Sequence, residues 1–194
     1  MSTLKHALRR SLTAAALAVV TAATCTTPAS ATPSQGYISG SGTVTDDWYN
    51  EGTLSMYNYR TTYAVGLWHR ILYAEGAYYP VGGAGSIVTP LQKQWIDCDF
   101  GSGTRIATQD LQNRWGLEAD GYVGPLTLGR ADNNLVLIGD YNTATQVVEY
   151  RGRAHTVQFL RVKSNGAYQF RRVASDGVTD GGWNTASYNT PGPC

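Results

Sequence analysis

The most constraining feature of the sequence is a turn pattern that occurs twice. The segment DCDFGSGT at 97–104 aligns with DGYVGPLT at 120–127, 23 positions further along. Each copy begins with Asp, carries an apolar residue directly before a Gly, and ends on a Thr suited to open a helix. The Gly permits a turn that a side chain would block, and the Thr hydroxyl can cap the first amides of the helix. The repeat therefore predicts two similar turns that lead into similar helices.

Apolar residues recur at helical spacing in three segments, which predict helices over 61–77, 104–115 and about 126–135. Gly116 follows the last periodic residue of the second segment, as is typical of a helix C-cap. The first two helices also correspond internally. Trp68-His69 and Leu111-Gln112 each place an apolar residue directly before a polar one in mid-helix.

From Val136 onward the period changes to two, and strands are expected over 147–150, 156–163 and 167–173. Asn165-Gly166 between the last two is typical of a hairpin turn. The tail after Asp176 consists of turn residues. The expected fold class is α+β, with a three-helix domain followed by a small antiparallel β-meander.

The N-terminus has the three parts of a secretory signal peptide. Lys5, Arg9 and Arg10 are followed by an apolar run over 12–23 and by the small residues of 29–31. We expect cleavage after residue 31 and export of the mature chain. The apolar run is too short to span a bilayer comfortably, so a retained anchor is the less favoured alternative.

Charge and cysteine content limit the possible binding partners and indicate whether the chain contains a disulfide. The first 31 residues hold three basic residues and no acidic one, which leaves 12 basic against 14 acidic residues and a formal charge of −2. This balance, with no polybasic segment, argues against nucleic acid or an anionic membrane surface as a partner. The mature chain retains Cys98 and Cys194. In an exported protein this pair predicts a disulfide, with two free thiols as the less favoured alternative.

Residues 100–135 resemble the small helical peptidoglycan-binding domain attached to many bacterial cell-wall hydrolases. The residues that carry the resemblance are Phe100, Gly101, Thr104, Leu111-Gln112, Gly116-Leu117, Asp120-Gly121, Val123-Gly124, Thr127 and Leu135. The first helix matches the opening of the family pattern more loosely, so the resemblance covers roughly 61–135. Cys98 stands where the family has Gly, and His69 where it has Gln. The loop over 78–95 is longer than usual, and the C-terminal strands have no counterpart.

The resemblance and a composition shift near residue 139 suggest four segments. They are a signal peptide (1–31), a flexible lead-in (32–60), a peptidoglycan-binding-like helical domain (61–138) and a β-rich C-terminal segment tied back by the disulfide (139–194). The shift is one of charge. Residues 32–139 contain six basic and ten acidic residues, whereas 140–194 contain six and four.

The function implied by the resemblance is non-catalytic binding of peptidoglycan by a secreted, wall-associated protein, through the glycan strand or the stem peptide. Aromatic faces can cover sugar rings, and guanidinium groups can pair with carboxylates. The candidate ligand-binding residues are Gln112, Asn113, Arg114, Trp115, Tyr122 and Arg130. Each of these side chains can instead belong to the core or to an ordinary solvated surface.

Catalytic motifs are missing from the sequence, and no cofactor or metal is expected. The mature chain contains only His69 and His155, which lie far apart in the sequence. Asp97 and Asp99 resemble part of a calcium loop, but the further ligands of such a loop are absent. The alternatives are a cell-wall hydrolase, a regulator of an exported cell-wall enzyme, or a secreted inhibitor, each acting through the C-terminal strands.

Overall fold

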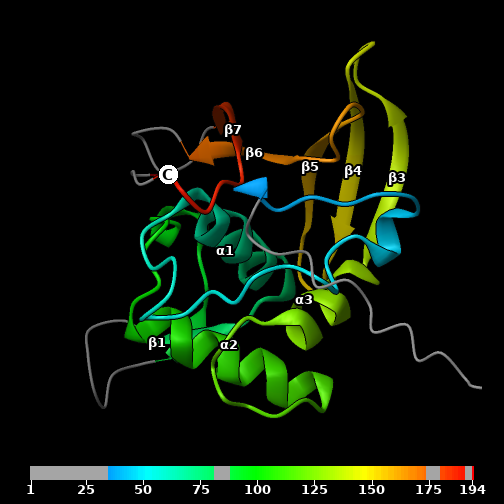
Figure 1. The fold of residues 1–194 in the computed structure, drawn as a ribbon. Helices are drawn as coiled ribbons and strands as arrows, with labels where there is room; N and C mark the ends of the chain where they lie inside the picture. The colour runs from blue at the N-terminus through cyan, green and yellow to red at the C-terminus, as the bar shows by residue number, and fades with distance from the viewer. Residues whose placement is uncertain (1–34, 81–87, 174–179, 191–193) are drawn as a thin grey trace, which may run out of the picture.

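The computed structural model describes residues 35–80, 88–173, 180–190 and 194 (Figure 1). The predicted signal peptide lies outside these ranges, as does part of the loop over 78–95. The elements in chain order are η2 (Val44–Asp46), α1 (Tyr63–Glu75), β1 (Tyr78–Pro80), β2 (Val88–Pro90), η3 (Lys93–Trp95), α2 (Ser102–Trp115), α3 (Pro125–Asp132), β3 (Leu135–Asp140), β4 (Thr145–Arg151), β5 (Thr156–Val162), β6 (Tyr168–Val173) and β7 (Asp180–Thr185). Within the described ranges, no helix is both long and apolar enough to cross a membrane.

Strands β3 to β7 form one antiparallel sheet in which each strand pairs with the next in sequence, and β1 and β2 form a separate two-stranded sheet. Val148 of β4 pairs with Phe159 of β5, which pairs with Phe170 of β6, and all three side chains are fully buried. These residues form a continuous apolar strip across the middle of the sheet. The β5–β6 connection runs over 163–167, with Gly166 in the left-handed region at φ 71°.

Helix α1 lies against this sheet and contacts β4, β5, β6 and β7 as well as α2 (Figure 1). Val65, Leu67, Trp68, Ile71 and Leu72 of α1 are all fully buried. Those side chains point to several sides of the helix, and a helix that is apolar all round is a central one.

The expectation of a three-helix domain followed by a separate meander is therefore wrong. The three α-helices of the described residues do not form a unit of their own, because α1 packs on the sheet and α3 packs against η2. The protein is α+β with a β-rich C-terminal half. The sequence pattern identified one apolar stripe on α1, but Leu67 and Ile71 supply further buried side chains outside that stripe.

The described part of the segment expected as a lead-in, from residue 35, supplies core side chains. Ile38, Trp48 and Leu54 are fully buried, and the Trp48 ring packs edge-on against Phe159 and Tyr168. The backbone of Ile38 accepts a hydrogen bond from the Tyr168 amide at 2.9 Å. This segment therefore packs on the sheet.

Three buried tyrosines donate hydrogen bonds to carboxylates from distant parts of the chain. The pairs are Tyr168 with Asp47 at 2.6 Å, Tyr188 with Glu51 at 2.7 Å, and Tyr150 with Glu75 at 2.7 Å. Burial, reinforced by the neighbouring carboxylate, raises the pKa of each tyrosine. Each pair satisfies polar groups that would otherwise be costly to bury, and the first two join the 35–60 segment to the sheet and the C-terminal tail.

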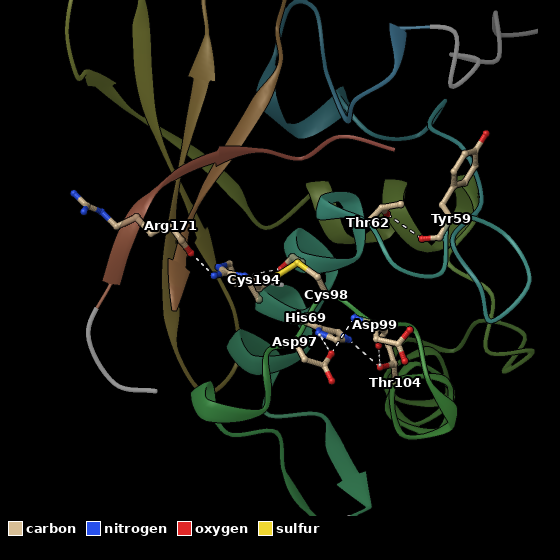
Figure 2. Close-up of a disulfide and its surroundings, with 11 residues drawn as sticks. Tyr59, Thr62, His69, Asp97, Cys98, Asp99, Thr104, Arg171 and Cys194 are labelled. Atoms are coloured by element: carbon tan, nitrogen blue, oxygen red, sulfur yellow. Dashed lines mark hydrogen bonds and ion pairs between the residues drawn. A yellow bond between two sulfur atoms is a disulfide. The ribbon is translucent and has the colours of Figure 1, made fainter. Parts of the chain in front are cut away.

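Cys98 and Cys194 form a disulfide, with their Cα atoms 5.4 Å apart, which confirms the predicted pairing (Figure 2). The bond lies against Gly66, near the N-terminal end of α1. A Cβ at Gly66 would overlap both sulfur atoms, so only glycine leaves room for the disulfide here. One turn further along α1, the Arg70 guanidinium donates to the carbonyls of Gly66 and Arg171 and lies over the Phe170 ring.

Candidate functional site

The two copies of the sequence repeat fold into matching turns, which we call the first turn (97–104) and the second turn (120–127). In the first, an Asp97 carboxylate oxygen accepts a hydrogen bond from the Asp99 amide at 2.9 Å. In the second, an Asp120 carboxylate oxygen accepts one from the Tyr122 amide at 2.8 Å. The residue between each pair has a positive φ. The opening Asp therefore has the same role in both copies.

The remaining positions of the two turns also correspond. Position two is Cys98 with φ 61° in the first turn and Gly121 with φ 76° in the second. Position eight is Thr104 or Thr127, whose hydroxyl donates to the carbonyl of position three at 3.2 or 3.4 Å. Helices α2 and α3 begin directly after the Gly at position five. The internal repeat predicted from the sequence is thus a repeated structural unit.

A buried polar side chain from the preceding helix holds each turn. Gln112 of α2 is 1% exposed and donates to Asp120 (2.9 Å), the Tyr122 carbonyl (2.9 Å) and Thr127 (3.0 Å). Its own carbonyl oxygen accepts the Gly121 amide at 2.9 Å. Gln112 therefore bonds to four residues of the second turn.

His69 of α1 occupies the equivalent place at the first turn (Figure 2). It is fully buried, and its Nε2 hydrogen-bonds the Thr104 hydroxyl at 2.8 Å. Its Nδ1 lies 3.6 Å from an Asp97 carboxylate oxygen, beyond hydrogen-bond range. Burial, with a smaller effect of the nearby Arg70 charge, lowers the pKa of His69 to about 3. The imidazole is therefore neutral at physiological pH.

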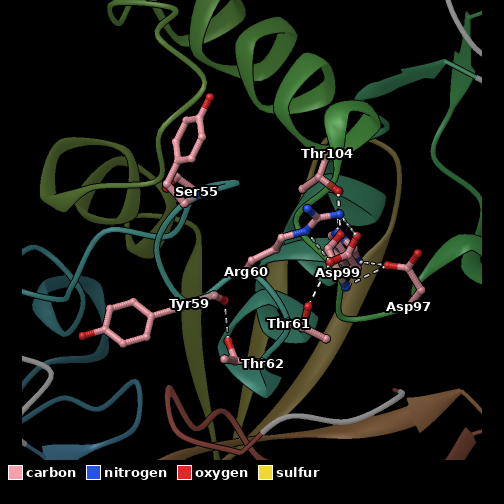
Figure 3. Close-up of polar contacts among 10 residues, drawn as sticks. Ser55, Tyr59, Arg60, Thr61, Thr62, Asp97, Asp99 and Thr104 are labelled. Carbon is pink, nitrogen blue, oxygen red and sulfur yellow. Dashed lines mark hydrogen bonds and ion pairs between the residues drawn. The ribbon is translucent and has the colours of Figure 1, made fainter.

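The two turns differ first at position three. In the first turn Asp99 is held in a bidentate ion pair by Arg60, at 2.9 and 3.2 Å, and also accepts the Thr61 hydroxyl at 3.0 Å (Figure 3). The pKa of Asp99 is lowered, chiefly by the hydrogen bonds that it accepts from Arg60. In the second turn this position is Tyr122, whose side chain is 38% exposed. Position three is about equally accessible in both copies, since the Asp99 side chain is 34% exposed, but it is an ion-paired carboxylate in the first and an aromatic ring in the second.

The second difference lies at position seven. This position is Gly103 in the first turn, and a Cβ built there would lie 2.5 Å from the Tyr79 ring. Tyr79 belongs to β1, which packs against α2. The second turn has Leu126 here, and that side chain is 81% exposed. Tyr79, from the loop that is longer than in the family pattern, therefore packs on position seven of the first turn, whereas position seven of the second turn is exposed.

An open groove of about 360 Å³ runs beside the second turn. Its walls combine apolar and polar side chains from the second turn, the end of α2 and the 35–60 segment. They include Thr53, Leu117, Glu118, Tyr122, Pro125 and Leu126. We call this the second-turn groove.

The candidate ligand residues from the sequence fall into separate places. Tyr122 and Gln112 both line the second-turn groove, although Gln112 is buried and already bonded within the turn. Trp115 packs edge-on against Trp68, and the Arg130 guanidinium lies 5.1 Å from the Trp115 ring centre. These two side chains therefore contact each other and lie outside the groove lining.

Arg114 and Asn113 also lie outside it. Arg114 donates to the Glu75 carbonyl at 3.0 Å and pairs with Asp110 at 3.2 Å, while Asn113 is exposed. Sequence reasoning missed Leu117, Glu118 and Leu126. Of these, Leu126 had a usable signal, because its counterpart in the first copy is a glycine.

The described residues contain no group of three or more His, Cys, Asp or Glu side chains positioned to hold a metal ion. His155 is exposed, and its ring stacks on that of Tyr73 with 4.3 Å between the centres. Asp132, at the end of α3, accepts the Trp48 amide at 2.8 Å, and burial raises its pKa to about 7. That carboxylate links the helix opened by the second turn to the 35–60 segment.

Comparison with protein-family models, curated proteins and solved structures finds no significant match to this chain. The resemblance of 61–135 to peptidoglycan-binding domains therefore stays a prediction made from its motif residues.

Proposed function

We propose that the protein binds bacterial cell-wall peptidoglycan without cleaving it, and that the second-turn groove makes the contact. One observation carries the proposal. The same turn is built twice, but in the first copy position three is ion-paired with Arg60 and position seven packs against Tyr79, whereas in the second copy Tyr122 and Leu126 are exposed and line an open groove. An exposed apolar pair on a rigid turn is suited to ligand contact.

The side chains of the groove suit a glycan. The Tyr122 ring and the Leu117 and Leu126 side chains offer apolar surface for the face of a sugar ring. Glu118 can accept hydrogen bonds from hydroxyls or from acetamide N–H groups, and Thr53 can donate one. The charged groups of the lining are acidic, which favours a neutral glycan or a stem-peptide amine over a stem-peptide carboxylate.

Gln112 contributes indirectly in this proposal. Its hydrogen bonds to Asp120, the Tyr122 carbonyl and Thr127 fix the turn that presents the exposed pair. A surface held rigid before binding loses less entropy when the ligand binds. The proposal needs only this turn and groove on a single α+β unit, and no separate helical domain.

The test is co-sedimentation of residues 32–194 with purified insoluble peptidoglycan, beside chitin and cellulose. This length contains every contact described above. We expect the protein to pellet with peptidoglycan, with no sugar or peptide released into the supernatant. Failure to pellet would overturn the proposed function, and release of fragments would identify a hydrolase instead.

Variants locate the contact. Tyr122→Ala and Leu126→Ala should each weaken sedimentation by about fivefold or more, because both side chains are exposed and their loss removes ligand surface. Tyr141→Ala is the matched control. Tyr141 is 52% exposed but follows β3 at the tip of the β3–β4 hairpin, at the opposite end of the molecule from α2 (Figure 1). Equal binding by all three variants would exclude the second-turn groove.

A further inference from the structure

A second cleft, of about 450 Å³, lies between the 35–60 segment and the β5–β6 turn. It is lined mainly by residues 39–50 on one side and 161–166 on the other, so we call it the hairpin cleft. None of its lining residues belongs to the second-turn groove. Its size falls within the roughly 300–1,000 Å³ of ligand sites, but its walls are much more polar than those of most such sites.

Two glycines bring the walls of the hairpin cleft together. The Gly40 amide donates to the Gly166 carbonyl at 3.2 Å. A Cβ at Gly166 would overlap the Gly40 carbonyl, and a Cβ at Gly40 would overlap the Asp47 side chain. The chain thus requires glycine on both sides of this crossing, which joins the two walls at a fixed position.

The cationic side chains of the cleft are engaged by carboxylates of the protein. Arg161 lies 2.9 Å from a carboxylate oxygen of buried Asp47, which also accepts the Tyr168 hydroxyl. Lys163 pairs with Asp140 at 2.9 Å. An anionic ligand would have to compete with these carboxylates, so the arrangement disfavours a phosphate or carboxylate ligand.

The groups that remain available are hydrogen-bonding ones beside an aromatic ring. In the part of the chain that the structure describes, no side chain pairs with the exposed Asp46 carboxylate. The Asn165 carbonyl oxygen accepts the Ala167 amide at 3.1 Å, which leaves the Asn165 NH₂ group to donate outward. Tyr49 is 37% exposed and lines the same cleft.

We propose that the hairpin cleft binds an uncharged, hydroxyl-rich ligand, namely a mono- or disaccharide unit. The Asp46 carboxylate accepts hydrogen bonds from sugar hydroxyls, the Asn165 amide donates to them, and the Tyr49 ring covers a face of the sugar. The inference goes beyond the proposed function, because it concerns a different surface and does not require the second-turn groove to bind the cell wall.

The experiment is ligand-observed NMR and calorimetric titration of residues 32–194 with glucose, galactose, N-acetylglucosamine, cellobiose and chitobiose. Sodium sulfate serves as the anion probe. At least one sugar should bind, and sulfate should neither bind in the cleft nor displace that sugar. Failure of all the sugars to bind would overturn the inference, as would displacement of the sugar by sulfate.

Three variants assign the binding to the cleft. Asp46→Asn removes the charge with little change of shape, and Tyr49→Ala removes the ring. Asn165→Asp keeps the oxygen that accepts the Ala167 amide but removes the outward NH₂ donors. Each should weaken sugar binding by about fivefold or more, whereas Tyr122→Ala in the other groove should leave it unchanged. Loss of sugar binding in Tyr122→Ala alone would place the sugar in the second-turn groove and overturn the inference.

Discussion

The first and second turns share one backbone design but differ in how they are held. The first is fixed from outside by the disulfide at Cys98, by Arg60 on Asp99, and by Tyr79 over position seven. The second has glycine at position two and is held by Gln112 of α2 and by the paired backbones of Leu54 and Val123. The same backbone unit is thus tied into the fold by a disulfide and an ion pair in one copy and borders an open groove in the other. The difference arises from a few side chains.

Removal of the disulfide should have the largest effect and should fall on the first turn. The Cys98→Ala/Cys194→Ala double variant is expected to lose about 4 kcal/mol of unfolding free energy, because the bond joins residues 96 apart in sequence and restricts the unfolded chain. Urea denaturation of the oxidised wild type and the variant measures the difference.

A matched variant separates the effect of losing the disulfide from the effect of the left-handed backbone at position 98. Cys98 has φ 61°, whereas the second turn has Gly121 at the same position. Cys98→Gly/Cys194→Ala should therefore be about 1 kcal/mol more stable than the double alanine variant, because glycine adopts a left-handed conformation without a steric cost. Equal stability of the two variants would mean that position two of the first turn is not strained.

Gln112→Ala should have the next largest effect, at the second turn. It removes hydrogen bonds to four residues and leaves buried groups unpaired, for a loss of about 3 kcal/mol in urea denaturation. The neighbouring Asn113 is exposed, and Asn113→Ala should change stability by less than about 0.5 kcal/mol. A similar, small change in both variants would contradict the role given to Gln112.

The smallest expected effect is a difference in acid sensitivity between the turns. His69 has a pKa lowered to about 3 by burial, against 6.5 for an ordinary histidine. The contribution of the buried neutral imidazole to the free energy of unfolding is complete above the pKa that His69 has in the unfolded chain. It is lost as the pH falls below that value, because only the unfolded chain takes up the proton. His69→Gln, which copies the residue of the second turn, should remove about 2 kcal/mol of acid destabilisation between about pH 6 and pH 4.5.

Urea denaturation across this pH interval checks the expectation, with His155→Gln as the control. His155 is exposed and stacks on Tyr73. His155→Gln should therefore show the same dependence of unfolding free energy on pH as the wild type. If His69→Gln and the wild type lose stability in parallel, the buried imidazole is not the source of the acid sensitivity.

Local patterns in the sequence predicted local structure well. The helical spacing around Trp68 and Leu111 matches α1 and α2, Gly116 ends α2 in the left-handed region with φ 70°, and the disulfide is present. The strand expected over 156–163 corresponds to β5. Each of these features depends on residues close in sequence or, for the disulfide, on there being a single possible pair once the predicted signal peptide, which contains Cys25, is removed.

The rest depended on contacts between distant residues. Trp48 lies in a segment rich in Ser, Gly, Thr and Asp, whose local pattern does not indicate burial. Its ring is buried against Phe159 of β5 and Tyr168 of β6, which lie more than 100 positions away in the sequence. The Tyr168–Asp47 pair joins residues 121 positions apart. Strand β7 was missed because its sequence, DGGWNT, has the composition of a turn.

The candidate site was only partly predictable for a related reason. Gln112 was selected as a surface amide, but an amide that follows a buried leucine in mid-helix can equally turn inward to hold a loop, as it does here. Leu126 could have been found from the sequence by comparing the two copies position by position. Glu118 had no such signal, because its place at the groove depends on how α2 ends.

The disulfide also divides the chain into a covalent ring and a tail. The ring runs from Cys98 to Cys194 and contains α2, α3 and every strand of the five-stranded sheet, whereas α1 belongs to the tail that packs into it. One proteolytic cut inside the ring would leave a single covalent molecule. One cut between α1 and Cys98 would leave two pieces held only by packing. Exposed to proteases, the protein would thus tolerate a nick in its sheet connections better than one in the loop over 78–95.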